Sequence, residues 1–397
     1  MQQINKQICI IGGGPAGSIT SLFLSKMEIP HLLLDRSKFP RDKVCGESLD
    51  GRVTHILNRL NPSLLEELRA KEIIVESRNW SFNLPKGIIP ISSGKEGSAR
   101  ILTKRKRFDA FLFAKAAESP FCEAKENINI TEYNYDGDDI VFQADQLEIR
   151  AQLGVVAVGF HSGLIKSEDA DKDVWFFNRT YYRHPKNFKN NETKIYYFDY
   201  PVKCCLYIMS MPNKEFNVEL GVEKGDYKRL KIRLEELVKM LIEQKQELKE
   251  WFADAQIIEK GKGVHLALNA RNENYSDRNL IYVGASAVCV NPITGMGIGN
   301  AMAMAEIAAY EIRGYIRQDD FSAKALNSYA IKVKARIKNV VLLSRISTFF
   351  FRNLKLFGPF LFVLGNTQLF IRIASRSELI KNIKNPRFYL KRIFTKA

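Results

Sequence analysis

The chain contains 397 residues, 46% of them hydrophobic, which suits two or three ordinary domains or one large fold with an inserted part. Its formal net charge of +16 is concentrated near the end, where fifteen Lys and Arg follow residue 331 against one acid, Glu378. The body before it is close to neutral and carries no recognised nucleic-acid-reading module, so we expect no nucleic acid partner.

The first residues and the cysteines indicate the compartment. A predicted strand begins within the first ten residues and leaves no room for a secretory signal. The six cysteines lack paired zinc spacing, and a large unexported chain needs no disulfide framework. We therefore expect reduced thiols, no metal, and a cytoplasmic protein, either free or peripheral to the inner face of a membrane.

Residues 7–36 have the pattern of a complete dinucleotide-binding unit, in which a glycine-rich turn and a helix connect two strands. Gly12 and Gly14 let a pyrophosphate approach the backbone, and Gly17 lets the helix lie close to the first strand. Asp35 ends the second strand, where a carboxylate accepts ribose hydroxyls. The alternative is a glycine loop that binds nothing. The predicted cofactor-binding residues are Gly12, Gly13, Gly14, Pro15, Ala16, Gly17, Asp35 and Arg36.

A loop before a predicted helix over 49–60 reads Lys43-Val44-Cys45-Gly46-Glu47-Ser48. Together with the glycine turn, it resembles the geranylgeranyl reductase branch of the FAD-dependent oxidoreductases, whose relatives include flavin-dependent halogenases and aromatic hydroxylases. The resemblance implies FAD as cofactor and places Lys43, Cys45 and Gly46 beside it, with Cys45 and Glu47 as catalytic candidates. From residue chemistry, Glu47 can fix a ribityl hydroxyl or a proton. Cys45 is either a soft thiol facing the flavin or a small buried hydrophobe.

Residues 280–302 carry the most specific part of the resemblance. A buried strand ends at Gly284, and a Pro and two glycines lead into an alanine-rich helix over 298–312. This order predicts a helix N-terminus aimed at the flavin pyrimidine, where its partial positive charge stabilises the reduced ring. Relatives usually have Asp where this chain has Ala285. The resemblance places the cofactor against Gly284, Ala285, Pro292, Gly295, Met296, Gly297 and Ile298.

Two further stretches are expected to lie beside the cofactor. Residues 103–117 read as an amphipathic helix after a basic run and resemble the family's Arg-x-x-Phe-Asp-x-x-Leu helix. By that match Arg107, or a close neighbour, contacts FAD, and the alternative is a solvated helix start. The strand over 147–158 ends at Val158, where relatives have Asp, and His161 beyond it is expected to be structural.

Residues 205–212 have the place and shape of the family's Tyr-x-Trp-x-Phe-Pro strand, with both large aromatics replaced. Tyr207, Met209 and Met211 are therefore expected on the substrate side. Thioether side chains are flexible where indole and phenyl rings are rigid. The missing tryptophans argue against a standard halogenase.

The expected fold is α/β: a Rossmann-like FAD-binding domain, a β-rich substrate domain and a helical C-terminal region. The FAD-binding parts are 1–72, 102–170 and 271–330, the substrate-side strands are 73–101, and the substrate domain is 171–270 with one helix over 230–252. The basic region 331–397 has no apolar run long enough to span a bilayer. It is expected either to touch anionic lipid or a carrier-bound substrate, or to pack as a helical subdomain with a solvated basic face.

These features predict an FAD-dependent oxidoreductase acting on a hydrophobic or aromatic substrate, including a carrier- or peptide-bound one. They do not separate a monooxygenase from a halogenase-like enzyme or a reductase. The sequence shows no second glycine fingerprint, which suits NAD(P)H bound transiently or a separate flavin reductase as electron donor. The rival hypothesis is a catalytically degenerate flavoprotein serving as a binding or assembly partner, motivated by Val158, Ala285 and the two methionines.

Overall fold

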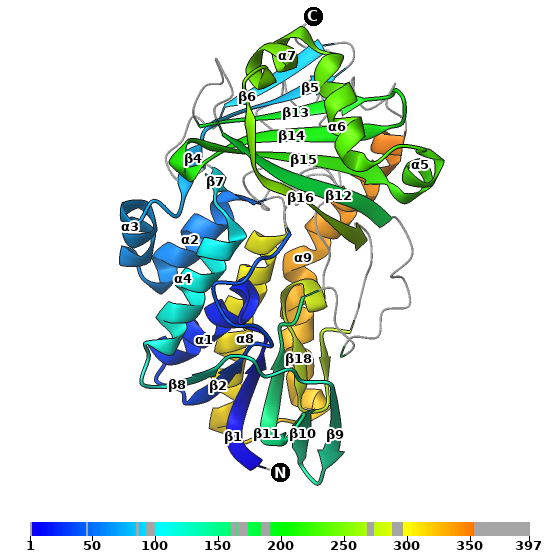
Figure 1. The fold of residues 1–397 in the computed structure, drawn as a ribbon. Helices are drawn as coiled ribbons and strands as arrows, with labels where there is room; N and C mark the ends of the chain where they lie inside the picture. The colour runs from blue at the N-terminus through cyan, green and yellow to red at the C-terminus, as the bar shows by residue number, and fades with distance from the viewer. Residues whose placement is uncertain are drawn as a thin grey trace, which may run out of the picture.

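The computed structural model describes residues 2–44, 47–84, 87–92, 100–159, 164, 174–183, 191–267, 274–287 and 297–352. Figure 1 shows two bodies, one around each of two large sheets, with a small third sheet between them. Within the described part of the chain, no helix has the length and apolar composition needed to cross a bilayer.

The first sheet has the strand order β17-β18-β11-β1-β2-β8, with the hairpin β9–β10 attached to β11. Its central pairs are parallel, and the end of β1, Cys9 to Ile11, is buried between β2 and β11. Strands covered on both faces read as continuous apolar runs, which explains the pattern at residues 8–11. The bounds are β1 (Gln2–Ile11), β2 (His31–Leu34), β8 (Cys122–Lys125), β9 (Glu132–Asp136), β10 (Asp139–Ala144), β11 (Leu147–Val156), β17 (Ser276–Asp277) and β18 (Leu280–Tyr282).

Helices pack against this sheet and against each other. α1 contacts both α4 and α8, and α8 contacts α2 and α9. Gly284 permits one close approach, because a Cβ there would lie 3.0 Å from the Cβ of Ala16 and 3.1 Å from that of Ala301. The bounds are α1 (Pro15–Lys26), α2 (Gly51–Leu60), α3 (Ser63–Ala70), α4 (Arg105–Ala117), α8 (Ile298–Gln318) and α9 (Ala323–Arg352).

The second sheet has the order β16-β12-β15-β14-β13-β5-β6 and is antiparallel except for the pair β13 and β5. Segment 73–101 supplies β5 and β6, so strands distant in sequence share this sheet. The bounds are β5 (Asn79–Leu84), β6 (Gly87–Ser92), β12 (Val174–Arg183), β13 (Glu192–Phe198), β14 (Cys204–Met211), β15 (Glu215–Glu223) and β16 (Gln256–Ala267).

Alternation along these strands gives the second sheet two different faces. One face, which includes Leu206, Val218 and Leu220, packs on the helices α6 (Leu234–Glu243) and α7 (Gln246–Phe252). The sequence prediction of one helix over 230–252 was therefore wrong in part, because the chain leaves helical geometry at Lys245, which has φ −126° and ψ 119°. The short helix α5 (Lys224–Arg229) precedes this pair.

The other face of the second sheet looks toward the first body, and we call it the pocket face. Its central row crosses the sheet through Lys262, Arg179, Glu219, Tyr207 and Ile195, which are paired in register. The third sheet joins the two bodies. It consists of β3 (Ser48–Leu49), β7 (Arg100–Leu102) and β4 (Val75–Ser77), with β7 in the middle.

Candidate active site

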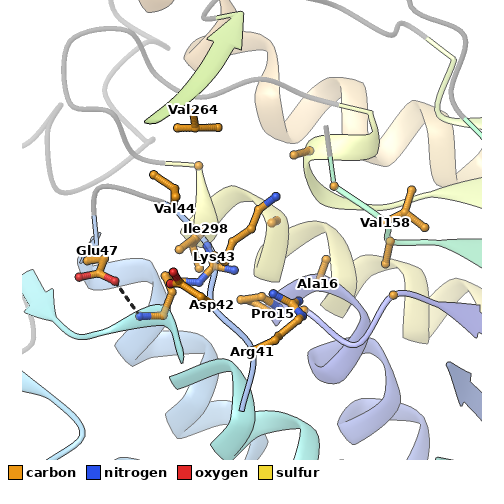
Figure 2. Close-up of a pocket in the computed structure, with 18 of the residues that line it drawn as sticks. Pro15, Ala16, Arg41, Asp42, Lys43, Val44, Glu47, Val158, Val264 and Ile298 are labelled. Carbon is orange, nitrogen blue, oxygen red and sulfur yellow. Dashed lines mark hydrogen bonds between the residues drawn. The ribbon is translucent and has the colours of Figure 1, made fainter. Parts of the chain in front are cut away.

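A cavity of about 310 Å³ lies where the pocket face meets the first body. Its wall on the first body comes from the loop after β1, the N-termini of α1 and α8, and the loop before β3. Figure 2 shows Pro15, Ala16, Arg41, Lys43 and Ile298 around this space, with Val264 of β16 on the opposite side. The cavity therefore joins the predicted nucleotide site to the predicted substrate side.

The turn before α1 forms a backbone cradle. Gly12 has φ +106°, and a Cβ there would lie 2.5 Å from the carbonyl oxygen of Ala157. A Cβ on Gly17, the third residue of α1, would lie 1.8 Å from the carbonyl oxygen of Gly12, so only glycine lets the helix lie this close to the turn. No side chain caps the N-terminus of α1, whose first residue is Pro15. Such a helix start binds diphosphates through its free N–H groups and its dipole.

Gly14 lines the cavity and, unlike Gly12 and Gly17, has room for a Cβ beside the backbone. Its backbone is extended, with φ −71° and ψ −175°, and a Cβ there would meet one atom, Nη2 of Arg41, at 3.3 Å. Glycine at this position therefore keeps space open in the cavity.

Asp35, which directly follows β2, stabilises the glycine turn through hydrogen bonds to backbone amides. Its Oδ2 accepts a hydrogen bond from the Gly13 amide at 2.8 Å, and its Oδ1 accepts one from the Ser37 amide at 2.9 Å. Asp35 and Arg36 both line the cavity. Sequence reasoning missed part of the neighbouring wall. It consists of Ile128, Asn129 and Ile130, which carry no motif and follow the end of β8, the strand beside β2.

Arg41 and Arg105 are two of the cations that line the cavity. Nη1 of Arg41 lies 3.4 Å from Oδ2 of Asp109, and Arg105 forms a two-pronged ion pair with the same carboxylate at 2.7 Å. The predicted residue Arg107 lies elsewhere, donating to the backbone carbonyls of Lys71 and Glu72. The Arg-x-x-Phe-Asp spacing that ends at Asp109 begins at Arg105, so this spacing could have identified the neighbour.

The N-terminus of α8 forms another part of the wall through Gly297 and Ile298, and no side chain caps it. Ala285 lines the cavity and is exposed to it, whereas Ser286 is buried and accepts a hydrogen bond from the Gly159 amide at 3.2 Å. Val158 also lines the cavity (Figure 2). The predicted residue Gly284 is buried and is absent from the described lining. The predicted residues Pro292, Gly295 and Met296 lie outside the described residues, as do Cys45, Gly46 and His161.

Glu47 lies at the junction of the two bodies, in the left-handed region with φ 53°. Its carboxylate is 1% exposed and accepts hydrogen bonds from the Arg105 amide at 3.1 Å and from the hydroxyl of Tyr181. Nη1 of Arg179 lies 3.2 Å from it. Burial raises the pKa of Glu47 to about 7, against the opposing effect of Arg179 and the hydrogen bonds. Glu47 therefore changes charge near neutral pH.

Arg179 ties the loop of the first body to the pocket face. Its side chain is 2% exposed and contacts the carboxylates of Glu47 and Asp42, both at 3.2 Å. Asp42 also pairs with Lys262. Beside this junction, Lys104 pairs with Glu215 at 2.6 Å. Charged groups thus fix the pocket face against the first body.

The wall from the second sheet contains the predicted residues Tyr207 and Met209. Met211 is buried against Leu102 and Tyr181 and is absent from the described lining. Sequence reasoning missed the other members of this wall, because strand pairing rather than any motif brings them to the cavity. They are Phe177, Thr193, Glu219 and Val264.

Glu219 is the carboxyl group of this wall. It is 5% exposed, and within the described part of the chain no hydrogen bond to its side chain is found. Burial raises the pKa of Glu219 to about 8, the negative charge of Glu47 adds to the rise, and Arg179 opposes it. Glu219 therefore holds a proton at neutral pH inside the cavity.

The residues present fit a dinucleotide such as FAD. Gly14 leaves the diphosphate cradle open, and two uncapped helix N-termini reach the same cavity. Ser48 lines the cavity, and its hydroxyl oxygen, which is buried in the absence of a ligand, has no hydrogen-bond partner among the described residues. A polar ligand in the cavity would satisfy such groups.

Comparison with known proteins agrees with this geometry. The chain matches the FAD binding domain family over residues 5–344. It is 25% identical over 351 residues to Conditioned medium factor receptor 1 of Dictyostelium discoideum, covering 81% of this chain and 66% of that protein. It is 23% identical over 340 residues to the digeranylgeranylglycerophospholipid reductase of Thermoplasma volcanium, covering 83% of this chain and 84% of that protein.

Two solved structures show the same fold. A geranylgeranyl bacteriochlorophyll reductase-like protein of Thermoplasma acidophilum superposes with a TM-score of 0.73 at 20% identity, covering 86% of this chain and 87% of that one. The flavin-dependent brominase Bmp2 superposes with a TM-score of 0.77 at 20% identity, covering 94% of both chains. The predicted α/β fold and the resemblance are confirmed, and the chain belongs to the FAD binding domain family as an FAD-dependent oxidoreductase.

Proposed function

We propose that this oxidoreductase reduces a carbon–carbon double bond of a hydrophobic substrate. The observation that carries the proposal is Glu219, a protonated carboxyl in the cavity wall on the side of the apolar Met209 and Phe177. The reductases among the relatives support the same direction. The rival hypothesis of a degenerate binding partner finds no support in the comparisons.

The cofactor would lie along the wall of the first body. We infer that the N-terminal amides of α1 hold the diphosphate, with Arg41 and Arg105 balancing its charge. Asp35 would accept the ribose hydroxyls, and the wall of residues 128–130 would flank the adenine. The N-terminus of α8 would face the other end of the cofactor, where its dipole favours negative charge.

Reducing a double bond requires a hydride on one carbon and a proton on the other. When bound and reduced, FAD supplies the hydride, and NAD(P)H or a separate flavin reductase is the proposed source of its electrons. Glu219 donates the proton from its carboxyl group and is left as a carboxylate. Bulk solvent then returns a proton to this carboxylate, which completes the balance.

The surroundings of Glu219 suit proton donation. Arg179 and Tyr207 flank it in register on β12 and β14, and Glu47 lies close enough to raise its pKa. An acid works best when its pKa is near the operating pH. Deprotonation of Glu219 above about pH 8 is therefore expected to lower turnover, and protonation below that pH to preserve it.

The test compares Glu219→Gln with the wild type under anaerobic conditions, using a digeranylgeranylglycerophospholipid as probe and chemically reduced flavin. The wild type should add two hydrogen atoms per double bond, read by mass spectrometry, with a rate that falls as pH rises through about 8. The variant should lose about 10²- to 10⁴-fold in turnover and lose this pH dependence. FAD affinity should stay unchanged.

Glu259→Gln is the matched control, because Glu259 is a carboxylate of β16 that pairs with Lys104 outside the cavity lining. Its turnover should equal that of the wild type. An unchanged rate in Glu219→Gln would remove Glu219 from the reaction. The wild type is also assayed in air. If the substrate gains oxygen there and gains no hydrogen without air, the reaction is hydroxylation and not reduction.

A further inference from the structure

Arg100, the first residue of β7, is a cation on the cavity wall that the proposed reaction does not use. It is 7% exposed, and its guanidinium carbon lies 3.7 Å from the centre of the Trp80 ring. Within the described part of the chain, its guanidinium forms no ion pair and no hydrogen bond. A guanidinium has five N–H donors, and leaving them unmatched in a buried place is costly.

The carboxylate whose charge acts on Arg100 is already occupied. Asp50 is close enough to act on the charge of Arg100, but its oxygens accept hydrogen bonds from the backbone and side chain of Arg52 at the start of α2. The phenols of Tyr207 and Tyr197 are the other groups whose charge acts on Arg100. Burial lowers the pKa of Arg100 to about 10, so it remains charged at neutral pH.

The position of Arg100 separates it from the diphosphate cradle. Trp80, on which it stacks, belongs to β5 of the second sheet, and β7 lies in the third sheet between the bodies. The cradle at Gly14 already has its own cations, Arg41 and Arg105. The rest of the wall on the side of Arg100 includes the apolar residues Met209 and Phe177.

We propose that Arg100 binds an oxyanion, a carboxylate or a phosphate, carried by an otherwise apolar substrate. The inference rests on the proposed function in that the substrate occupies the same cavity. A guanidinium accepts either oxyanion through two parallel hydrogen bonds, and its stacking on Trp80 fixes the plane of the fork. Recognition would therefore place the charged group at Arg100 and the apolar part along the second sheet.

The test measures binding of three probes with one alkyl chain, dodecyl phosphate, dodecanoate and dodecanol, to the FAD-loaded protein by calorimetry. Arg100→Met should weaken at least one of the two anionic probes by about 10- to 100-fold, the loss expected for a charge-assisted hydrogen bond. Dodecanol should bind both proteins equally. The anionic probe that loses more affinity identifies the oxyanion as phosphate or carboxylate.

Arg183→Met is the matched control, because Arg183 is a half-exposed arginine of β12 outside the cavity lining. Arg100→Lys should recover only part of the anion affinity, since an ammonium lacks the planar fork. Equal anion binding by Arg100→Met and wild type would overturn the proposal. So would a loss of dodecanol binding as large as the loss of anion binding.

Two further readouts separate the competing roles of Arg100. If it contacts the cofactor instead, Arg100→Met should lower FAD affinity and leave anion binding unchanged relative to wild type. If it is structural, the variant should melt below the wild type, whereas removing an unmatched buried cation should leave the melting temperature equal or higher. Anion binding is measured without turnover, so a failure of the proposed reduction leaves this result readable.

Discussion

The two walls of the cavity are built by different means. The wall of the first body uses backbone, with glycines that cannot carry a Cβ and helix N-termini without side-chain caps. The wall of the second sheet uses side chains such as Glu219 and Tyr207, which reach the cavity because neighbouring strands pair in register. A backbone site accepts one shape of ligand, whereas a side-chain wall can change its chemistry without changing the fold.

The largest effects are expected from substituting two glycines at the start of α1. Gly14→Val should lower FAD affinity by at least about 100-fold, because the new side chain fills the cradle, while the extended backbone tolerates it in the FAD-free protein, where its Cβ would meet only the end of the Arg41 side chain at 3.3 Å. Gly17→Val should prevent folding, since its Cβ would overlap the Gly12 carbonyl. FAD titration and circular dichroism distinguish these outcomes. Full FAD occupancy in Gly14→Val would refute the placement of the diphosphate.

The next largest effect is expected where charge joins the two walls. Arg179→Met leaves the buried Glu47 without its ion pair, and breaking a buried pair costs about 3–5 kcal/mol. Urea unfolding of the FAD-free protein measures the loss in free energy of unfolding. The double variant with Glu47→Gln should recover part of it. A loss below about 1 kcal/mol would mean that the walls are held together by packing instead.

The smallest expected effect concerns Ala285, in the wall formed by the first body. Ala285→Asp should tighten FAD about tenfold, because Ala285 is exposed to the cavity and a carboxylate there can accept a cofactor hydroxyl. Ala285→Asn is the control that keeps the shape without the charge, and its gain should be smaller. Fluorescence titration of FAD gives both values, and unchanged affinity in both variants would place Ala285 away from the cofactor.

The contrast between the walls also explains what the sequence can predict. The glycine turn, Asp35 and the start of α8 were recognisable because each needs particular residues at fixed spacing in one stretch of chain. Glu219 and Arg100 gave no such signal. Their meaning depends on pairing between strands and on burial, which follow from packing the whole chain.

Two other differences have local causes. Arg107, or a close neighbour, was favoured through the match to the family's Arg-x-x-Phe-Asp-x-x-Leu helix, and the ion pair with Asp109 belongs to Arg105, one helical turn before that carboxylate. The helix over 230–252 was predicted from a continuous apolar period, and such a period does not reveal the break at Lys245. The assignment of segment 73–101 to the substrate side came from its strand pattern and remains a prediction about domain boundaries.

The parallel pairing of β5 with β13 has a consequence for synthesis of the protein. Asn79–Leu84 leaves the ribosome more than a hundred residues before its partner Glu192–Phe198. Until then, the β5 edge of the hairpin formed with β6 is open, beside the aromatic side chains of Trp80 and Phe82. An open apolar edge invites pairing with other chains. A gene cut between β11 and β12 would leave β5 in a fragment without β13, so this edge would stay open and that fragment should not be recoverable alone.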